Sequence, residues 1–349
     1  MGMLSTLRDL KKPLRLLISS SESWNMRIEK IRYELTKPVI TSKAQVSSRV
    51  GWAVVMDEGE FSGCGEILPL EGWSSVTIEE AYSQLVSYKH SEIAMSELSN
   101  EVQSAINLAI WNLEASKNDE TLLEHLGGGS DCVKVNALLD GSSQRNLRSG
   151  LESYRLSGLS VFKVKLGFRD DQERLQLLSE IVQEDERIRL DPNGSWSLQY
   201  AVTFLDRARK LLGDRLEYVE DPVANFEDLK KLRSIVPVPI AADELCNSIN
   251  DLKAFISENL GEYIVIKPSL IGGIDQTLEI SSYAEENNIQ TVISSTYDGP
   301  IALQGWCAVA ANVAPEVTHG LGTADLFSDA QMRKMVPKAG KVYFNLTSD

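Results

Sequence analysis

Several features that would direct a chain of 349 residues toward particular functions are scarce here. There are only three histidines and four scattered cysteines without a C-x-x-C pair, so we expect neither a histidine-rich zinc site nor a disulfide framework. Basic residues are outnumbered, with 35 lysines and arginines against 50 aspartates and glutamates. The resulting net charge of −15 argues against nucleic acid or an anionic membrane as the main partner. Scattered cysteines suit a reducing compartment, so we expect a cytoplasmic protein.

Long apolar runs are lacking as well. No stretch approaches the roughly 18 uninterrupted apolar residues of a membrane span. The short run at 14–18 follows two lysines, but no clear cleavage site comes after it, so we expect no signal peptide. A strand-like segment starts at Met26. We therefore predict that residues 1–25 are a disordered extension outside the fold, with Met1 or Met26 as the true start. The oligomeric state stays open.

The expected secondary structure divides the chain into parts. Residues 26–130 show three short strand-like runs and then amphipathic helical segments, which predicts an α+β unit. Over residues 131–323, short apolar runs alternate with helical segments. This alternation predicts an α/β fold, a (β/α) barrel of eight strands, with an open doubly wound sheet as the alternative. In the last part, 324–349, the segment Val342–Phe344 is expected to return as a strand to the first unit.

Five charged residues each close one of these apolar runs: Lys165, Asp191, Glu220, Asp243 and Lys267. The intervals between them run from 23 residues (220 to 243) to 29 residues (191 to 220), about the length of one strand–helix unit. Such short apolar runs are typical of parallel strands buried on both faces. The charges would then lie at the carboxyl ends of the strands, where α/β barrels build their active sites. The pattern therefore predicts an enzyme, and its spread over five units favours the barrel.

Three of these residues are carboxylates that end adjacent strands. In a barrel, Asp191, Glu220 and Asp243 would converge within reach of one ion, and their oxygens suit Mg²⁺, with Mn²⁺ as the alternative. Asn193 would not bind the ion itself but would orient one of its ligands. Any one acid alone would be better explained as a helix N-cap or a solvated loop residue. Three acids in register predict a metal site.

Lysines flank the predicted metal site. Lys163 and Lys165 alternate with apolar residues on one strand, so both point to the same face, and the barrel interior is the expected one. Cationic neighbours lower each other's pKa, which suits a lysine acting as a base; salt bridges at a strand end are the alternative. Lys267 lies four units further along the rim. A metal between lysines agrees with a known catalytic pattern, in which the metal binds the carboxylate of a small anionic substrate and a lysine removes the adjacent proton.

Short motifs at these strand ends resemble the enolase superfamily, muconate-lactonising subgroup, from about Met26 to the C-terminus. They are Lys-x-Lys at 163–165, Asp-x-Asn at 191–193, Glu-Asp-Pro at 220–222, Asp-Glu at 243–244 and Lys-Pro at 267–268. The resemblance implies a modified TIM barrel of the (β/α)7β type and an α+β N-terminal capping domain completed by the C-terminal tail. It also implies a Mg²⁺-dependent reaction through an enediolate.

Within the subgroup, the chain is most similar to the branch that forms o-succinylbenzoate in menaquinone and phylloquinone biosynthesis. The similarity lies in the segments 31–35, 63–70, 294–295 and 319–323. It implies a syn-dehydration of 2-succinyl-6-hydroxy-2,4-cyclohexadiene-1-carboxylate, with the capping domain closed over the mouth of the barrel.

The resemblance also implies roles for individual residues. Lys165 would take the proton next to the carboxylate and return it to the leaving hydroxide. Lys267 would stabilise the enediolate from the other face, and Lys163 would tune Lys165. The substrate carboxylates would be held by residues after the seventh and eighth strands: Ser294, Ser295 and Gly320.

Other functions stay open on the same scaffold. An N-acylamino acid racemase or a dipeptide epimerase would use both lysines as bases. Dipeptide epimerases usually carry Asp-x-Asp after the eighth strand, whereas residues 320–325 read Gly-Leu-Gly-Thr-Ala-Asp. This departure disfavours an epimerase without excluding a racemase. A non-catalytic barrel that keeps its metal site for stability or partner binding is a further hypothesis.

Overall fold

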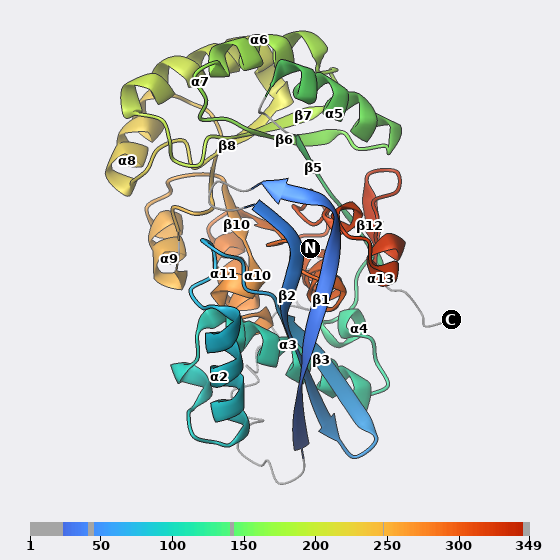
Figure 1. Cartoon of the computed structure of the whole chain (residues 1–349). Coiled ribbons are helices and arrows are strands. Elements are labelled where there is room, and N and C mark those ends of the chain that lie inside the picture. Colours follow the sequence, from blue (N-terminus) through green and yellow to red (C-terminus); the bar gives the residue numbers. More distant parts are fainter. Residues whose placement is uncertain (1–23, 41–44, 140–142, 247, 345–349) are drawn as a thin grey trace, which may run out of the picture.

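The N-terminal part of the computed structural model is an antiparallel sheet packed against helices (Figure 1). The structure describes residues 24–40, 45–139, 143–246 and 248–344. Strands β1 (Trp24–Ile40), β2 (Gln45–Glu58) and β3 (Phe61–Ile67) pair in that order, and Gly59 turns the chain between β2 and β3 with φ +62°. Most of the predicted extension at 1–25 lies outside the described residues, and its last two residues begin β1.

Helices α2 (Ile78–Lys89) and α3 (Asn100–Lys117) pack against this sheet. The 3-10 turn η2 (Met95–Glu97) connects them, and α4 (Leu122–His125) follows. Helix α3 lies close to β3 because β3 presents glycines to it. A Cβ at Gly63 or Gly65 would lie 2.2 Å or 1.9 Å from a backbone oxygen of α3, a separation that no side chain tolerates. Buried residues of the three strands, of α2 and of one side of α3 form an apolar core of their own, whereas Leu108, Trp111 and Leu123 of α3 and α4 belong to the core of the barrel.

Seven parallel strands follow, and each pairs with its neighbours in chain order. They are β5 (Ala137–Leu139), β6 (Val161–Lys165), β7 (Arg187–Asp191), β8 (Leu216–Glu220), β9 (Ile240–Ala242), β10 (Tyr263–Ile266) and β11 (Gln290–Ile293). The helices between and after them are α5 (Gln144–Leu156), α6 (Asp171–Ile181), α7 (Leu198–Leu212), α8 (Phe226–Ile235), α9 (Ile249–Ser257), α10 (Pro268–Ile271), α11 (Ile274–Glu286) and α12 (Pro300–Val313). A 3-10 turn, η3 (Gly213–Arg215), joins α7 to β8.

A short segment at 317–320 closes the barrel between its first and last strands. Val135 pairs with His319, and Ser294 pairs with Gly320, both in parallel. The His319 imidazole is fully buried there and joins two backbone groups, accepting from the Ile293 amide and donating to a carbonyl. Burial lowers the pKa of His319 to about 3, so it stays neutral. Seven strand–helix units and this closing segment confirm the predicted (β/α)7β barrel, and the open doubly wound alternative is wrong.

The C-terminal segment contacts the N-terminal sheet and forms a separate two-stranded sheet with β4 (Cys132–Lys134). After η4 (Ala324–Leu326), the Ser328 amide donates to the Glu34 carbonyl of β1 at 3.0 Å. Beyond α13 (Ala330–Lys334), strand β12 (Lys341–Tyr343) pairs antiparallel with β4 (Cys132–Lys134). The expected C-terminal strand therefore lies beside β4, just before the barrel, and contacts to the N-terminal sheet come from residues 325–328.

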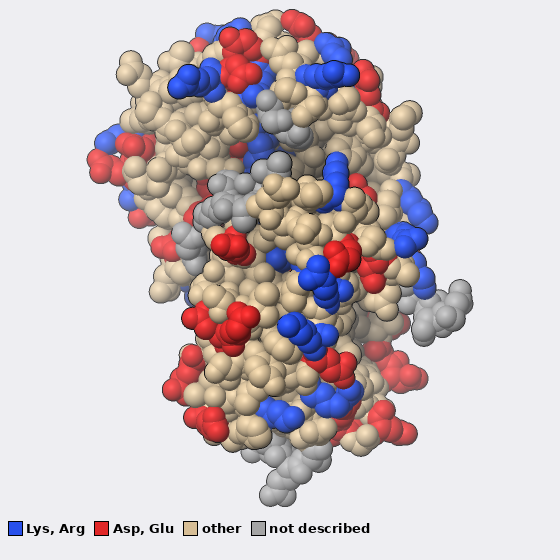
Figure 2. Space-filling model, viewed as in Figure 1, with Lys and Arg blue, Asp and Glu red and all other residues tan. Residues whose placement is uncertain are grey.

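Acidic and basic side chains are interspersed on the face of the molecule shown in Figure 2. Exposed acidic and basic side chains also pair across short distances, and Lys134, for example, lies 3.0 Å from Glu316. Within the part of the chain that the structure describes, no helix is long and apolar enough to cross a membrane.

Candidate active site

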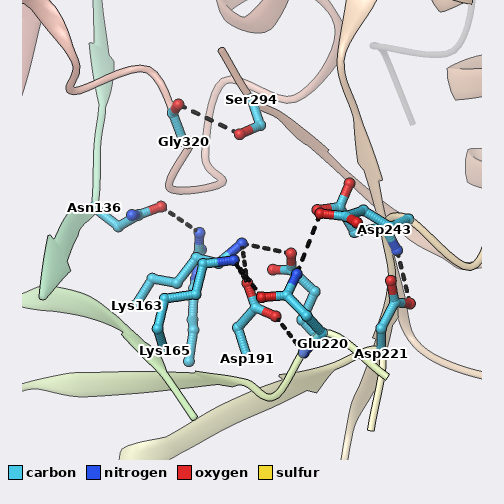
Figure 3. Close-up of polar contacts among 12 residues, drawn as sticks. Asn136, Lys163, Lys165, Asp191, Glu220, Asp221, Asp243, Ser294 and Gly320 are labelled. Atoms are coloured by element: carbon cyan, nitrogen blue, oxygen red, sulfur yellow. Dashed lines mark hydrogen bonds and ion pairs between the residues drawn. The ribbon is translucent and has the colours of Figure 1, made fainter. Parts of the chain in front are cut away.

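The carboxyl ends of β6 to β10 bring the predicted site residues together. On β6, Phe162 and Val164 are fully buried toward the helices, whereas Lys163 and Lys165 point to the barrel interior. Asp191 and Glu220 end β7 and β8, and the next two members, Asp243 and Lys267, directly follow β9 and β10. The period-2 alternation of a strand therefore places both β6 lysines beside the carboxylates (Figure 3).

A row of ion pairs connects these side chains. The Lys163 ammonium lies 2.8 Å from Asp191 Oδ2 and also contacts Glu220 Oε1. The Lys165 ammonium lies 2.6 Å from Asp191 Oδ2. At the other end of the row, Lys267 pairs with Asp243. Lys165 and Lys267 thus occupy opposite ends of the carboxylate row, and Lys163 lies between Asp191 and Glu220.

The pKa values of the carboxylates shift in different directions because their neighbours differ. Burial opposes ionisation of Asp191, but Lys163 and Lys165 outweigh it and hold the pKa of Asp191 below its usual range. Burial raises the pKa of Glu220 well above its ordinary value, and Asp191 and Asp243 add to the effect. The Glu220 and Asp243 carboxyls also hydrogen-bond each other. The ionisation of Glu220 therefore depends on the charge of the other two acids.

The same acids act on the lysines. Although burial favours the neutral amine of Lys163, Asp191 and Glu220 raise the pKa of Lys163 well above its ordinary value. Asp243 likewise outweighs burial and raises the pKa of Lys267. Adjacent lysines were expected to lower each other's pKa. The pKa of Lys163 is raised instead, because Asp191, Glu220 and Asp243 together favour its charged form.

The donor set fits a hard cation. Among the described residues, no three acid, histidine or cysteine side chains are gathered at metal-ligand distances. The Lys163 ammonium nevertheless bridges two of the carboxylates, and Glu220 contacts the third, so all three converge on one region. Oxygen ligands alone are what Mg²⁺ prefers, so Asp191, Glu220 and Asp243 are the residues that could hold such an ion, as the sequence predicts.

Two further residues position the members of the row. The Asn193 side chain accepts from Lys165 at 2.8 Å and donates to Glu244 at 3.2 Å. Its backbone amide donates to Asp191 Oδ1 at 3.0 Å. The buried Asp221 carboxylate accepts from the backbone amides of Asp243 and Leu245, at 3.0 and 2.9 Å. Asp221 appeared in the sequence only as the centre of a Glu-Asp-Pro motif, which was the one signal for it.

A buried arginine lies beneath the cluster, on the same face of β7 as Asp191. Arg189 donates to both Glu217 oxygens at 2.7 and 3.0 Å, to Asn136 Oδ1 at 3.0 Å and to the Thr318 carbonyl at 2.7 Å. These bonds tie β7 to β8, to the start of β5 and to the closing segment. Arg189 therefore braces the barrel under the site.

The predicted substrate contacts lie apart from the carboxylate row, after β11 and in the closing segment (Figure 3). Ser294 Oγ donates to the Gly320 carbonyl at a long 3.5 Å. A Cβ at position 320 would lie 2.5 Å from Ser294 Oγ, so any larger residue there would have to displace the Ser294 side chain. The Ser295 hydroxyl instead donates to Asp298 Oδ2 at 3.0 Å and accepts from the Thr323 hydroxyl at 3.3 Å. Of the two serines, Ser294 has the hydroxyl less engaged by the protein.

Sequence reasoning missed two side chains at the mouth. Leu138 pairs with Lys163 in register, points to the same side, and is 40% exposed. Trp73, from the loop after β3, lies with its ring centroid 5.2 Å from the Lys267 ammonium. The sequence around Trp73 does not indicate this contact, because the loop after β3 and the end of β10 are far apart in the chain.

The chain is similar in sequence to known proteins and to two family models. The family model described as enolase C-terminal domain-like matches residues 146–343, and the MenC N-terminal domain model matches residues 26–109. The o-succinylbenzoate synthase of Aliivibrio fischeri is 26% identical over 315 residues, which are 86% of this chain and 90% of that protein. The o-succinylbenzoate synthase of Escherichia coli K12 is 28% identical over 300 residues, 85% and 89% of the two chains.

A solved structure agrees in fold. The dipeptide epimerase from Enterococcus faecalis V583, complexed with Mg and the dipeptide L-Leu-L-Tyr, superposes with a TM-score of 0.80 and 20% identity. The match covers 93% of this chain and 98% of the epimerase. At this identity the match establishes the shared architecture.

Proposed function

The chain belongs to the enolase superfamily, and on that premise we propose that it is an o-succinylbenzoate synthase. It would dehydrate 2-succinyl-6-hydroxy-2,4-cyclohexadiene-1-carboxylate to o-succinylbenzoate and water, a carbon–oxygen lyase reaction in menaquinone or phylloquinone biosynthesis. The observation that carries the proposal is the row of buried carboxylates with Lys165 at one end and Lys267 at the other. The MenC match over residues 26–109 and the two named relatives support the choice of substrate.

Asp191, Glu220 and Asp243 would hold Mg²⁺, or Mn²⁺ in its place. When bound, the ion would neutralise the substrate carboxylate and so acidify the adjacent carbon. The three acids are already nearly or fully buried, at 0%, 1% and 7% exposure, so they would bind the ion in a dry site where its field is strong.

Two lysines would then divide the proton chemistry. Lys165, in its neutral form, would remove the proton next to the carboxylate, and Lys267, as an ammonium, would stabilise the charge that develops on the other face. Lys165 would return the proton to the departing hydroxyl group, so that one C–H and one C–O bond break and water leaves. Lys163, between Asp191 and Glu220, would tune Lys165 through its charge.

Substrate contacts would complete the site. Ser294 and Gly320 would face a substrate carboxylate, while Ser295 would support Ser294 through its bonds to Asp298. Leu138 offers an apolar wall beside Lys163, which suits an unsaturated six-membered ring. The segment 320–325 carries one acid, Asp325, and lacks the paired acids that an amino-group ligand requires, which favours the dehydratase over a dipeptide epimerase.

A direct assay separates the candidate functions. The purified protein with Mg²⁺ should convert the cyclohexadiene substrate to the aromatic product, followed by ultraviolet absorbance. Lys165→Ala and Lys267→Ala should each abolish turnover. Exchange of solvent deuterium into an N-acylamino acid without aromatic product would favour the racemase instead. Turnover that survives Lys165→Ala would contradict the mechanism.

A further inference from the structure

The loop between β3 and α2 carries Trp73 from the N-terminal sheet to the mouth of the barrel. Trp73 lines a small pocket of about 110 Å³ together with Asp243, Glu244 and Lys267, which all come from the barrel. Its ring centroid lies 5.2 Å from the Lys267 ammonium, inside the roughly 6 Å range of a cation–π contact. A residue from one sheet thus contacts a reacting group that the other sheet supplies.

Hydrogen bonds fix this loop at both ends. Before Trp73, the buried Arg49 guanidinium donates to the carbonyls of Leu68 and Pro69, the latter at 3.0 Å. After it, Ser75 donates through its hydroxyl to Glu101 of α3 at 2.8 Å and also through its amide. The same Arg49 donates to the carbonyls of residues 296 and 297, which follow β11 at the barrel mouth. The position of the indole is therefore set by the fold.

The ring face of Trp73, and not its N–H group, makes the contact. Trp73 Nε1 is buried and has no acceptor among the residues that the structure describes. A buried donor without an acceptor destabilises the fold. The N–H group therefore does not account for the position of the indole, and the contact between its ring and Lys267 does. The ring contribution is an electron-rich face against a nearly buried ammonium, since Lys267 is only 8% exposed.

We propose that Trp73 is a positioning residue that holds the Lys267 ammonium at the substrate face once Asp243 no longer binds it. Among the described residues, Lys267 makes an ion pair with the Asp243 carboxylate and a cation–π contact with the Trp73 ring. Asp243 is a predicted metal ligand, so any cation there competes with Lys267 for its oxygens. The Trp73 ring is not a ligand of the metal ion, so its contact with the Lys267 ammonium persists and keeps Lys267 oriented. Only the expected effect of Trp73 on turnover rests on the proposed function.

Two substitutions at one position test this role. Trp73→Phe keeps an aromatic face and removes the unsatisfied N–H, whereas Trp73→Leu keeps apolar bulk and removes the aromatic face. Trp52→Leu is the matched control, because Trp52 also contacts a lysine, Lys30 at 5.8 Å, within the N-terminal sheet. In each protein, with and without Mg²⁺, the modification rate of Lys267 by trinitrobenzenesulfonate is read by peptide mass spectrometry.

We expect Trp73→Phe and Trp52→Leu to leave Lys267 reactivity as in the wild type, and Trp73→Leu to raise it several-fold, most strongly with Mg²⁺. In the dehydration assay, Trp73→Leu should lower kcat by about 2- to 30-fold, the range of a cation–π contact, with little change in KM. Trp73→Phe should retain wild-type kcat.

Two results would overturn the proposal. One is unchanged Lys267 reactivity in Trp73→Leu, and the other is a loss in Trp73→Phe as large as that in Trp73→Leu. If the wild-type protein forms no aromatic product, the proposed function fails, while the reactivity measurement still decides the role of Trp73.

Discussion

Replacing Lys163 with methionine tests both the ion pairs of the site and its affinity for a cation. Lys163 is 16% exposed and contacts Asp191 and Glu220, whose side chains are 0% and 1% exposed. Removing one partner of a buried pair leaves charge without compensation, which destabilises a protein by about 3–5 kcal/mol. Asp191 keeps Lys165, so we expect the lower part of this range.

The measurement is thermal unfolding in EDTA, with Lys134→Met as the control. Lys134 pairs with Glu316 at the surface, where the side chains are 45% and 90% exposed, and such pairs contribute about 0–1 kcal/mol. At about 2–4 °C per kcal/mol, Lys163→Met should lower Tm by roughly 6–12 °C, and the control by a few degrees at most. The pKa of Lys163 is raised, so its contribution is complete below about pH 10 and the deficit should be equal at pH 7 and 9.

Added Mg²⁺ should reverse much of this loss. In the variant, a cation no longer competes with the Lys163 ammonium for the carboxylate oxygens, so Mg²⁺ should bind more tightly than to the wild type and raise Tm further. Titration calorimetry measures the affinity directly. A deficit in EDTA no larger than that of Lys134→Met would refute the ion-pair reasoning. A deficit that Mg²⁺ does not reduce would refute the metal site.

Three further predictions concern the surroundings of the site. Gly320→Ala would place a Cβ 2.5 Å from Ser294 Oγ, so it should destabilise the fold by about 1–3 kcal/mol in denaturant unfolding, and Ser294→Gly should restore stability in the double variant. Ser294→Ala should raise KM in the dehydration assay, whereas Ser295→Ala should chiefly lower stability, because Ser295 bonds to Asp298. Burial raises the pKa of Glu66 to about 8, so the folded state binds a proton that the unfolded state lacks between about pH 4.5 and 8. Stability should fall as pH rises through that window, and Glu66→Gln should flatten this profile.

The barrel was predictable because its signals are local. Each buried parallel strand reads as a short apolar run, and a charged residue closes five of them in turn, from Lys165 to Lys267. The alternation within β6 also predicted that Lys163 and Lys165 share a face, and the structure has both beside Asp191. These inferences needed only the period of a strand and the rule that barrel sites lie at carboxyl ends.

The interactions among those residues were less predictable. The direction of the Lys163 pKa depends on how many carboxylates surround one ammonium, and spacing along the chain does not state this number. The same holds for Asp221, whose carboxylate turns back to the amides of the following strand end. Charge effects vary with separations of a few ångströms, which only packed strands define.

By itself, the sequence determined the order of strands and helices, the residues at each strand end and hence the barrel class, and its resemblance to the enolase superfamily implied the (β/α)7β type. The tertiary structure decided which groups meet across elements. Trp73 reaches Lys267 because α3 docks on α11, where Asn107 and Trp111 bond to Asp275 at 2.8 and 3.0 Å. Residues far apart in the chain share no periodic pattern, so their contact depends on the shapes of two packed surfaces, and only the folded molecule contains that information.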